Sequence, residues 1–307
     1  MRNHYCKALY EIMSVNDNVY ALTADIGYSN FDRIRADFPE RFINVGVAEA
    51  NMIGIAAGMA LSGKIPFVFT IAPFITMRCL EQIRVDLCYQ KLNVKIIGVG
   101  AGFVYGAQGT THHAIEDVGI LRTLPQMNII CPADPAETEK AVHASMNLTT
   151  PLYIRLARNN EPVLTAGNDK FIFGKAFTMR QGGDITVIGY GPILKNVFDA
   201  AEILEKENID VRIVNMHTVK PIDREAILKC AEETGKIITV EEHNIIGGLG
   251  SAVAEVLAEG NCGNIKFKRM GIQDSYCEIH ANYEELQEEY GLNCAAVVKE
   301  IKNISGS

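Results

Sequence analysis

Short apolar runs alternate with helical patterns along almost the whole of this 307-residue chain. Several runs in the first half are continuously rather than alternately hydrophobic, which is typical of strands buried on both faces. Strands are predicted at residues 19–25, 41–46, 65–71, 94–100, 127–132 and 152–157, and helices at about 48–61, 74–90, 117–123 and 135–146. This order predicts a parallel sheet covered by helices.

The alternation breaks over residues 159–183, where Pro162, Gly167 and the pair Gly182–Gly183 indicate a connection with one short strand. A second series follows, with strands predicted at 184–191, 211–216, 236–242 and 265–270, helices at 193–207, 223–233 and 248–259, and a helical tail from about 282. We therefore predict an α/β fold with two three-layer α/β/α domains, each built on a parallel or mixed sheet. The expected boundaries are 1–165 and 183–307, joined by a linker at 166–182.

Charge argues against two classes of partner. The formal net charge is −8 and the chain has no run of lysine or arginine, whereas a nucleic acid or a membrane surface would favour a basic face. No apolar stretch approaches the roughly 20 residues that span a bilayer. The first residues include Glu11 and lack the apolar core of a signal peptide. We expect no nucleic acid and no membrane partner.

Eight cysteines occur, and none of them forms a CxxC pair. Cys79, Cys88, Cys131 and Cys230 lie in apolar surroundings, where cysteine behaves as a small hydrophobic residue. Buried, reduced thiols are therefore expected rather than disulfides or a metal site. A cytoplasmic location follows as the expectation.

A carboxylate begins the helix predicted after residue 46. Glu49 is followed by small residues, and Gly54 and Gly58 would let another helix approach closely, although each glycine lowers helix stability by about 1 kcal/mol. A helix of this kind is expected in a subunit interface. Its apolar setting would favour the protonated form of Glu49. Glu49 could equally serve only to complement the positive end of the helix dipole.

Two further features lie at predicted strand ends, where ligands of open α/β sheets bind. Phe74 stands where a strand gives way to a helix, and its ring could stack on a planar heterocycle or belong to the core. A loop with glycines at 100, 102, 106 and 109 closes on Thr110, Thr111, His112 and His113. Such a loop is typical of a functional site, whereas adjacent histidines point apart and do not suit a metal.

Two arginines leave the last predicted strand of the first domain. Arg155 and Arg158 are three positions apart and therefore face opposite sides of the strand, so only one of them can enter a given pocket. Its planar guanidinium would suit a phosphate or carboxylate, and a surface ion pair is the alternative.

Seven motifs follow one another along the chain: DIGYSN (25–30), RFINVGVAEANMIGIAAGMA (41–60), FITMRCLEQIR (74–84), GAQGTTHHAIEDVGILR (106–122), CPADPAE (131–137), TVIGYG (186–191) and EEHNIIGGLGSAV (241–253). In this order they resemble the C-terminal half of transketolase over nearly the full chain, especially the small subunit of transketolases encoded by two genes. The resemblance implies a pyrimidine-binding domain for thiamine diphosphate followed by a transketolase C-terminal domain.

The resemblance also implies roles for residues at the cofactor. Glu49 matches the family glutamate that bonds N1′ of the aminopyrimidine ring and activates the cofactor, and Phe74 matches the aromatic residue that stacks on that ring. Asp25 matches a residue near the cofactor, and Arg78 is expected among its ligands.

Other residues are implied at the substrate. His112 matches the active-site histidine that contacts a substrate oxygen, and Arg158, Ser29 and Arg2 match ligands of the substrate phosphate. One position departs from the pattern, because Gln108 stands where transketolases have an aspartate that reads a substrate hydroxyl. An amide both donates and accepts, whereas a carboxylate only accepts, so the usual sugar specificity is in doubt.

The chain lacks the Gly-Asp-Gly motif with which the family binds Mg²⁺ and the cofactor diphosphate. We therefore expect no metal ligands in this chain, and an N-terminal partner subunit that carries the motif in an α2β2 heterotetramer. The implied activity is transfer of a two-carbon ketol unit from a ketose, expected to be phosphorylated, to an aldose. Two alternatives remain open, a β subunit of a 2-oxoacid dehydrogenase or decarboxylase and a noncatalytic partner subunit.

Overall fold

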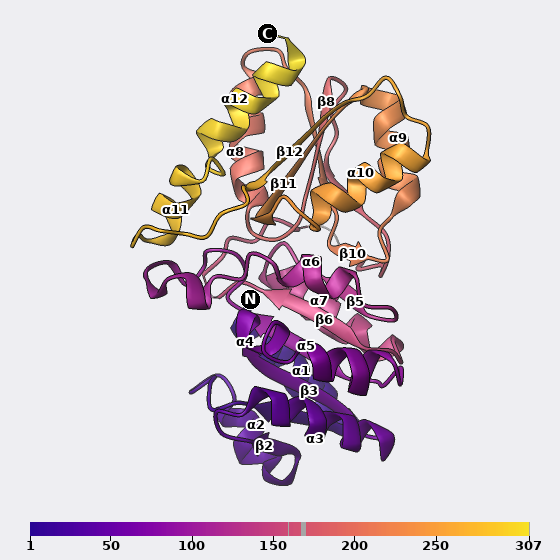
Figure 1. Cartoon of the computed structure of the whole chain (residues 1–307), viewed down its shortest axis with the longest axis vertical. Coiled ribbons are helices and arrows are strands. Elements are labelled where there is room, and N and C mark those ends of the chain that lie inside the picture. Colours follow the sequence, from indigo (N-terminus) through magenta and orange to yellow (C-terminus); the bar gives the residue numbers. More distant parts are fainter. Residues whose placement is uncertain (159, 167–169, 307) are drawn as a thin grey trace.

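The computed structural model describes residues 1–158, 160–166 and 170–306. The two halves of the chain form two stacked bodies, with the second half above the first in Figure 1. The predicted linker includes residues 167–169, which lie outside the described residues together with 159 and 307. The boundaries proposed for the two domains stay predictions.

The first sheet has seven strands in the order β10-β5-β6-β4-β3-β1-β2, and all neighbours are parallel except β10 and β5. Its central strands are buried along their whole length, as continuous apolar runs predict. The strands are β1 (Val19–Thr23), β2 (Phe42–Asn44), β3 (Ile65–Ile71), β4 (Lys95–Val99), β5 (Asn128–Ile130), β6 (Leu152–Leu156) and β10 (Thr218–Lys220).

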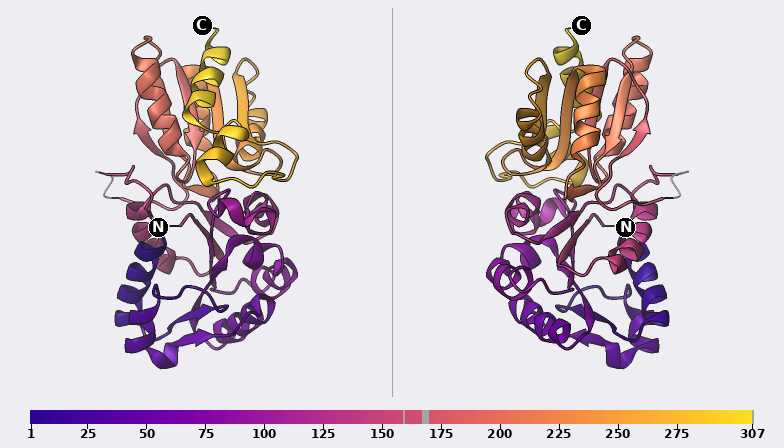
Figure 2. Two further views of the ribbon diagram at one scale, coloured as in Figure 1. Left: turned by 90° about the vertical axis from the view of Figure 1, so that its left-hand side faces the viewer. Right: turned by 90° about the vertical axis from the view of Figure 1, so that its right-hand side faces the viewer.

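Helices cover both faces of this sheet, as the side views in Figure 2 show. On one face α1 and α7 pack on strand residues such as Phe67 and Ile97, and on the other α3 and α6 pack on residues such as Val68 and Ile96. The helices are α1 (Arg2–Val15), α2 (Asp32–Asp37), α3 (Glu49–Leu61), α4 (Ala72–Thr76), α5 (Leu80–Gln82), α6 (Asp117–Arg122) and α7 (Pro135–Ala144).

The second sheet has the order β12-β11-β8-β9-β7, with β7 antiparallel to β9 and the other neighbours parallel. Helices α8 and α12 cover one face, and α9 and α10 cover the other. These elements are β7 (Phe177–Arg180), β8 (Ile185–Gly189), α8 (Leu194–Glu205), β9 (Val211–Asn215), α9 (Arg224–Thr234), β11 (Lys236–Asn244), α10 (Leu249–Glu259), β12 (Lys266–Ile272), α11 (Tyr283–Glu289) and α12 (Cys294–Ser305). The predicted fold class of two layered α/β domains is confirmed.

One local prediction was wrong, and one strand was not predicted. The helix expected over 74–90 is broken, because the chain turns at residues 77–79 and continues through α5 into a π-helical segment, Ile83–Cys88. No sequence pattern indicated β10, a short strand from the second half that pairs with β5 of the first sheet. In Figure 1 it lies beside the upper edge of that sheet. The two halves therefore share backbone hydrogen bonds.

The eight cysteines, all within the described residues, are free thiols, and six of them are buried. Burial raises the pKa of the Cys79 thiol to about 12, so it stays protonated and inert. In the part of the chain that the structure describes, no helix is long and apolar enough to cross a bilayer.

Candidate active site

The carboxyl ends of the parallel strands bring the predicted residues to one edge of the first sheet. Glu49 begins α3 after β2, Phe74 lies in α4 after β3, His112 follows β4 in a loop, and Arg158 follows β6. Since β1, β3, β4 and β6 are neighbours in the sheet, their ends meet where ligands of α/β proteins bind.

Glu49 is buried, with 3% of its side chain exposed, and its Oε2 accepts a hydrogen bond of 2.7 Å from Nη1 of Arg78. The guanidinium of Arg78 also lies over the ring of Phe74, 4.6 Å from its centroid. The turn at residues 77–79 brings Arg78 back over Phe74. Within this chain the Glu49 carboxylate is paired with a half-exposed cation, and the apolar subunit interface expected around it stays a prediction.

His112 connects Phe74 to the glycine-rich loop. Its ring meets the ring of Phe74 edge-on at 5.2 Å between centroids and that of Tyr105 at 5.8 Å. Its Nδ1 lies 2.9 Å from the hydroxyl oxygen of Thr111. Partial burial lowers the pKa of His112 below its ordinary value, so the imidazole is neutral at neutral pH.

Tyr105 was missed by the sequence analysis, although a polar aromatic side chain inside a glycine-rich loop was a usable signal. The guanidinium carbon of Arg158 lies 5.6 Å from the centroid of its ring. Burial raises the pKa of the Tyr105 hydroxyl, while the charges of Arg2 and Arg158 lower it, so both arginines lie near it. Gly100 has a φ of +92°, and a Cβ there would lie 2.0 Å from the Tyr105 ring, so only glycine leaves room for this packing.

The two arginines of β6 are separated as their spacing predicted. Arg155 is buried, and its Nε donates to Asp117 Oδ2 at 2.8 Å, so it forms an ion pair in the protein interior. Arg158 faces Tyr105 instead. Arg2 is joined to Arg158 through the backbone, because its amide donates to the Arg158 carbonyl at 2.9 Å.

Three predicted residues lie to the side of this group. Gln108 is exposed at the end of a short 3₁₀ turn, Gly106–Gln108. Asp25 and Ser29 belong to the loop after β1, both with left-handed backbone conformations (φ of 54° and 65°). The Asp25 carboxylate accepts a bond of 3.2 Å from Asn44, which tethers this loop to the end of β2.

Among the described residues, Glu49 and Phe74 are partners of the kind that an aminopyrimidine would need. The planar, hydrogen-bond-donating guanidinium of Arg78 lies on Phe74 and bonds Glu49, which shows that a flat donor group can use both partners together. Within residues 1–158, 160–166 and 170–306, no group of three or more histidine, cysteine, aspartate or glutamate side chains could hold a metal ion.

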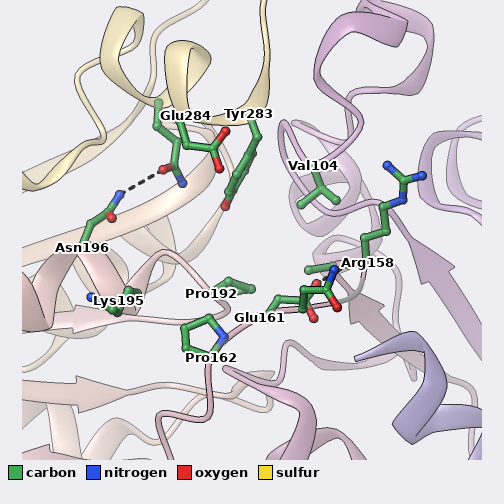
Figure 3. Close-up of a pocket in the computed structure, with 12 residues that line it drawn as sticks. Val104, Arg158, Glu161, Pro162, Pro192, Lys195, Asn196, Tyr283 and Glu284 are labelled. Carbon is green, nitrogen blue, oxygen red and sulfur yellow. Dashed lines mark hydrogen bonds between the residues drawn. The ribbon is translucent and has the colours of Figure 1, made fainter.

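Behind Arg158, the two halves of the chain enclose a pocket of about 460 Å³. Figure 3 shows Val104 and Arg158 from the first half on one side of it, and Tyr283 and Glu284 from the second half on the other. The guanidinium of Arg158 points out of this pocket in Figure 3. Residues of the second half of the chain thus share a pocket with Val104 and Arg158, which lie beside Tyr105.

Two known family models match this chain, one in each half. The family model described as transketolase, pyrimidine binding domain, matches residues 1–163, and transketolase, C-terminal domain, matches residues 174–297. The chain belongs to the transketolase family. This transketolase chain is 39% identical over 300 residues to one subunit of the apulose-4-phosphate transketolase of Phocaeicola vulgatus, covering 97% of this chain and 95% of the relative.

Two further comparisons define the type of transketolase. "6-deoxy-6-sulfo-D-fructose transketolase subunit SqwH" of a Clostridium species is 39% identical over 300 residues, covering 97% of this chain and 92% of that one. A solved structure, "Split gene transketolase, inactive beta4 tetramer", is 40% identical with a TM-score of 0.92, covering 99% of this chain and 98% of that chain. The chain is therefore the C-terminal subunit of a split-gene transketolase, and hence one component of a transferase.

Proposed function

We propose that this subunit supplies the aminopyrimidine half of a thiamine-diphosphate site that transfers a two-carbon ketol unit from a phosphorylated ketose to an aldose. The observation that carries the proposal is the buried Glu49 carboxylate beside the partly buried ring of Phe74, with His112 against the same ring at 5.2 Å. Thiamine diphosphate, when bound, would supply the carbanion chemistry that breaks and forms the carbon–carbon bonds.

In this proposal two residues of the chain receive the pyrimidine, and a third makes room for it. Glu49 shares a proton with a ring nitrogen, and Phe74 stacks on the ring face. Arg78 now occupies both partners, so it must release Glu49 when the ring enters, and its half-exposed side chain leaves it free to move within the site. Asp25, which lies on the neighbouring loop, is assigned to the cofactor end of the site.

The proposed substrate residues lie beyond His112. The neutral His112 hydrogen-bonds a substrate oxygen, and Arg158 and Arg2 attract an anionic group, since both lie near Tyr105. Ser29 is assigned to the same anionic group. Gln108 replaces a carboxylate at the position that reads a substrate hydroxyl, so the donor is expected to differ from that of ordinary transketolases.

The other half of the site is assigned to the N-terminal subunit of the split enzyme. A C-terminal subunit implies such a partner, and we propose that the partner carries the Mg²⁺ ligands in an α2β2 assembly. The surface of α3 supports a close contact with another chain, because a Cβ added at Gly54 or Gly58 would meet nothing within 4 Å. Val47, just before this helix, and Leu61 at its end are 75% and 65% exposed. We assign the assembly to the cytoplasm.

The test is reconstitution with an N-terminal subunit that contains Gly-Asp-Gly, thiamine diphosphate and Mg²⁺, followed by a coupled assay of ketol transfer. Phosphorylated and unphosphorylated ketoses are compared as donors, and each chain is also assayed alone. Ketol transfer by the mixture of the two subunits, and by neither subunit alone, supports the proposal. Release of CO₂ from a 2-oxoacid without ketol transfer would identify a decarboxylating enzyme, and no turnover with any donor would indicate a noncatalytic subunit.

A further inference from the structure

His113, the neighbour of His112, has no part in the proposed chemistry and is almost completely buried, with 2% exposed. Its Nε2 lies 2.8 Å from the carbonyl oxygen of Gly106. Because a carbonyl only accepts, Nε2 must carry the hydrogen. Burial is the main cause that lowers the pKa of His113, so the ring is neutral, and Nδ1 finds no hydrogen-bond partner among the described residues.

This hydrogen bond closes the loop that carries His112. The loop makes two short 3₁₀ turns, Gly106–Gln108 and Thr110–His112, separated by Gly109 with a φ of +79°. Glycines give such a loop many accessible conformations, and ordering them is costly. The bond from His113 to Gly106 joins the residue after the second turn to the first residue of the first turn, so it restrains both turns.

The second half of the chain holds the same loop from outside. The ring of Phe103 packs against His113 at 5.2 Å and against Tyr290, near the end of α11, at 4.9 Å. The hydroxyl of Thr110 donates to the carbonyl of Cys277 at 2.9 Å. A Cβ at Gly106 would lie only 3.2 Å from the carbonyl oxygen of Ala281. The loop is therefore fixed between the first sheet and the C-terminal segment.

The end of the loop is fixed as well. Nη2 of the buried Arg155 donates to the carbonyls of Ala114 at 2.6 Å and Glu242 at 2.9 Å, one from each half of the chain. Tyr283 and Gln287, which line the pocket of Figure 3, donate to the carboxylate of the same Glu242. With its far end anchored in this way, the remaining freedom of the loop lies in the two turns that His113 joins.

We propose that His113 is a positioning residue: its Nε2–H bond to Gly106, braced by the C-terminal domain, holds His112 against Phe74 and Tyr105. His113 itself is too deeply buried to meet a substrate. The expected effect of His113 on turnover rests on the proposed function. The restraint that His113 places on the loop does not. In this proposal the C-terminal domain helps to hold the loop that bears His112.

The experiment compares two variants of the full chain. His113→Leu removes the donor with little change in volume, and His113→Gln restores an N–H donor of similar reach. His217→Leu is the matched control, because His217 is buried to the same extent and its Nδ1 bonds Thr218 outside this loop. Each chain is studied alone by hydrogen exchange and melting, and in the reconstituted complex by kcat, KM and calorimetric binding of thiamine diphosphate.

His113→Leu is expected to lower kcat about tenfold, the scale of a lost hydrogen bond and a misplaced group, with KM and cofactor affinity within about twofold. Amides of residues 106–114 should exchange faster than in the wild type, and His113→Gln should restore both properties. His217→Leu should lower the melting temperature without slowing turnover. Unchanged loop exchange in His113→Leu, or equal loss of kcat in both His113 variants, would overturn the proposal. An inactive wild-type complex would refute the proposed function alone, since loop exchange would still report the restraint.

Discussion

The ion pair between Arg78 and Glu49 predicts a measurable coupling in the isolated chain. Arg78→Met leaves a carboxylate that is 3% exposed without its charge-assisted hydrogen bond of 2.7 Å. Hydrogen bonds to charged groups contribute about 1.5–3 kcal/mol. Since Arg78 is 50% exposed, water screens the pair and the lower end applies, about 1.5 kcal/mol. In a Glu49→Met background the same arginine substitution should cost only the contact with the Phe74 ring, about 0.5–1 kcal/mol.

The four chains of this double-mutant cycle are unfolded in urea at pH 7 and low salt, with circular dichroism as the probe. Added salt should reduce the coupling, because one partner is exposed. If Arg78→Met changes the free energy of unfolding equally with Glu49 and with Met at that position, the two side chains do not interact. The pairing of Arg78 with Glu49 in the proposed pyrimidine site would then be wrong.

Two further predictions concern stability. Burial lowers the pKa of Lys95, whose Nζ donates to the Leu148 carbonyl at 2.6 Å, from 10.5 to about 7, so the unfolded chain binds more protons between these values. The free energy of unfolding should therefore rise with pH from 7 towards 10.5, by up to about 1.4 kcal/mol per pH unit. Urea unfolding of Lys95→Met should lack this rise. Parallel profiles of unfolding free energy against pH for Lys95→Met and the wild type would contradict the prediction. Gly100→Ala should destabilise the chain by at least about 1 kcal/mol, the scale of left-handed backbone strain, and by more than Gly63→Ala, which has a similar φ of +81° but open space. Equal melting temperatures for the two glycine variants would show that the Tyr105 ring is not held against Gly100.

The strands could be predicted because their signal is local. Runs such as 65–71 and 152–157 are mostly apolar without alternation, and both became buried strands of the first sheet. Strand β10 (Thr218–Lys220) has only three residues and depends on β5, far away in the sequence, so no local pattern encodes it. The broken helix after Phe74 was missed for a related reason, since apolar periodicity continues across a turn that only tertiary packing explains.

The candidate site shows the same division. Glu49, Phe74, His112 and Arg158 follow strands, and both the strand-end rule and the family motifs indicated them. The contacts between them were not predictable, because they join residues from different strand ends. The pairing of Arg78 with Glu49 at 2.7 Å is an example, since it depends on a turn that the sequence pattern concealed.

The function proposed for this chain depends most on the Glu49 carboxyl group, which is to activate the aminopyrimidine ring of thiamine diphosphate. The direct measurement is the rate at which the acidic ring proton of the bound cofactor exchanges with deuterium, followed by quenched-flow NMR in the reconstituted complex. Glu40→Gln, at an exposed position, is the control. Glu49→Gln should slow the exchange at least about a hundredfold with the cofactor still bound, the scale of one general acid/base contribution. Exchange at the wild-type rate in a fully loaded Glu49→Gln complex would contradict this role.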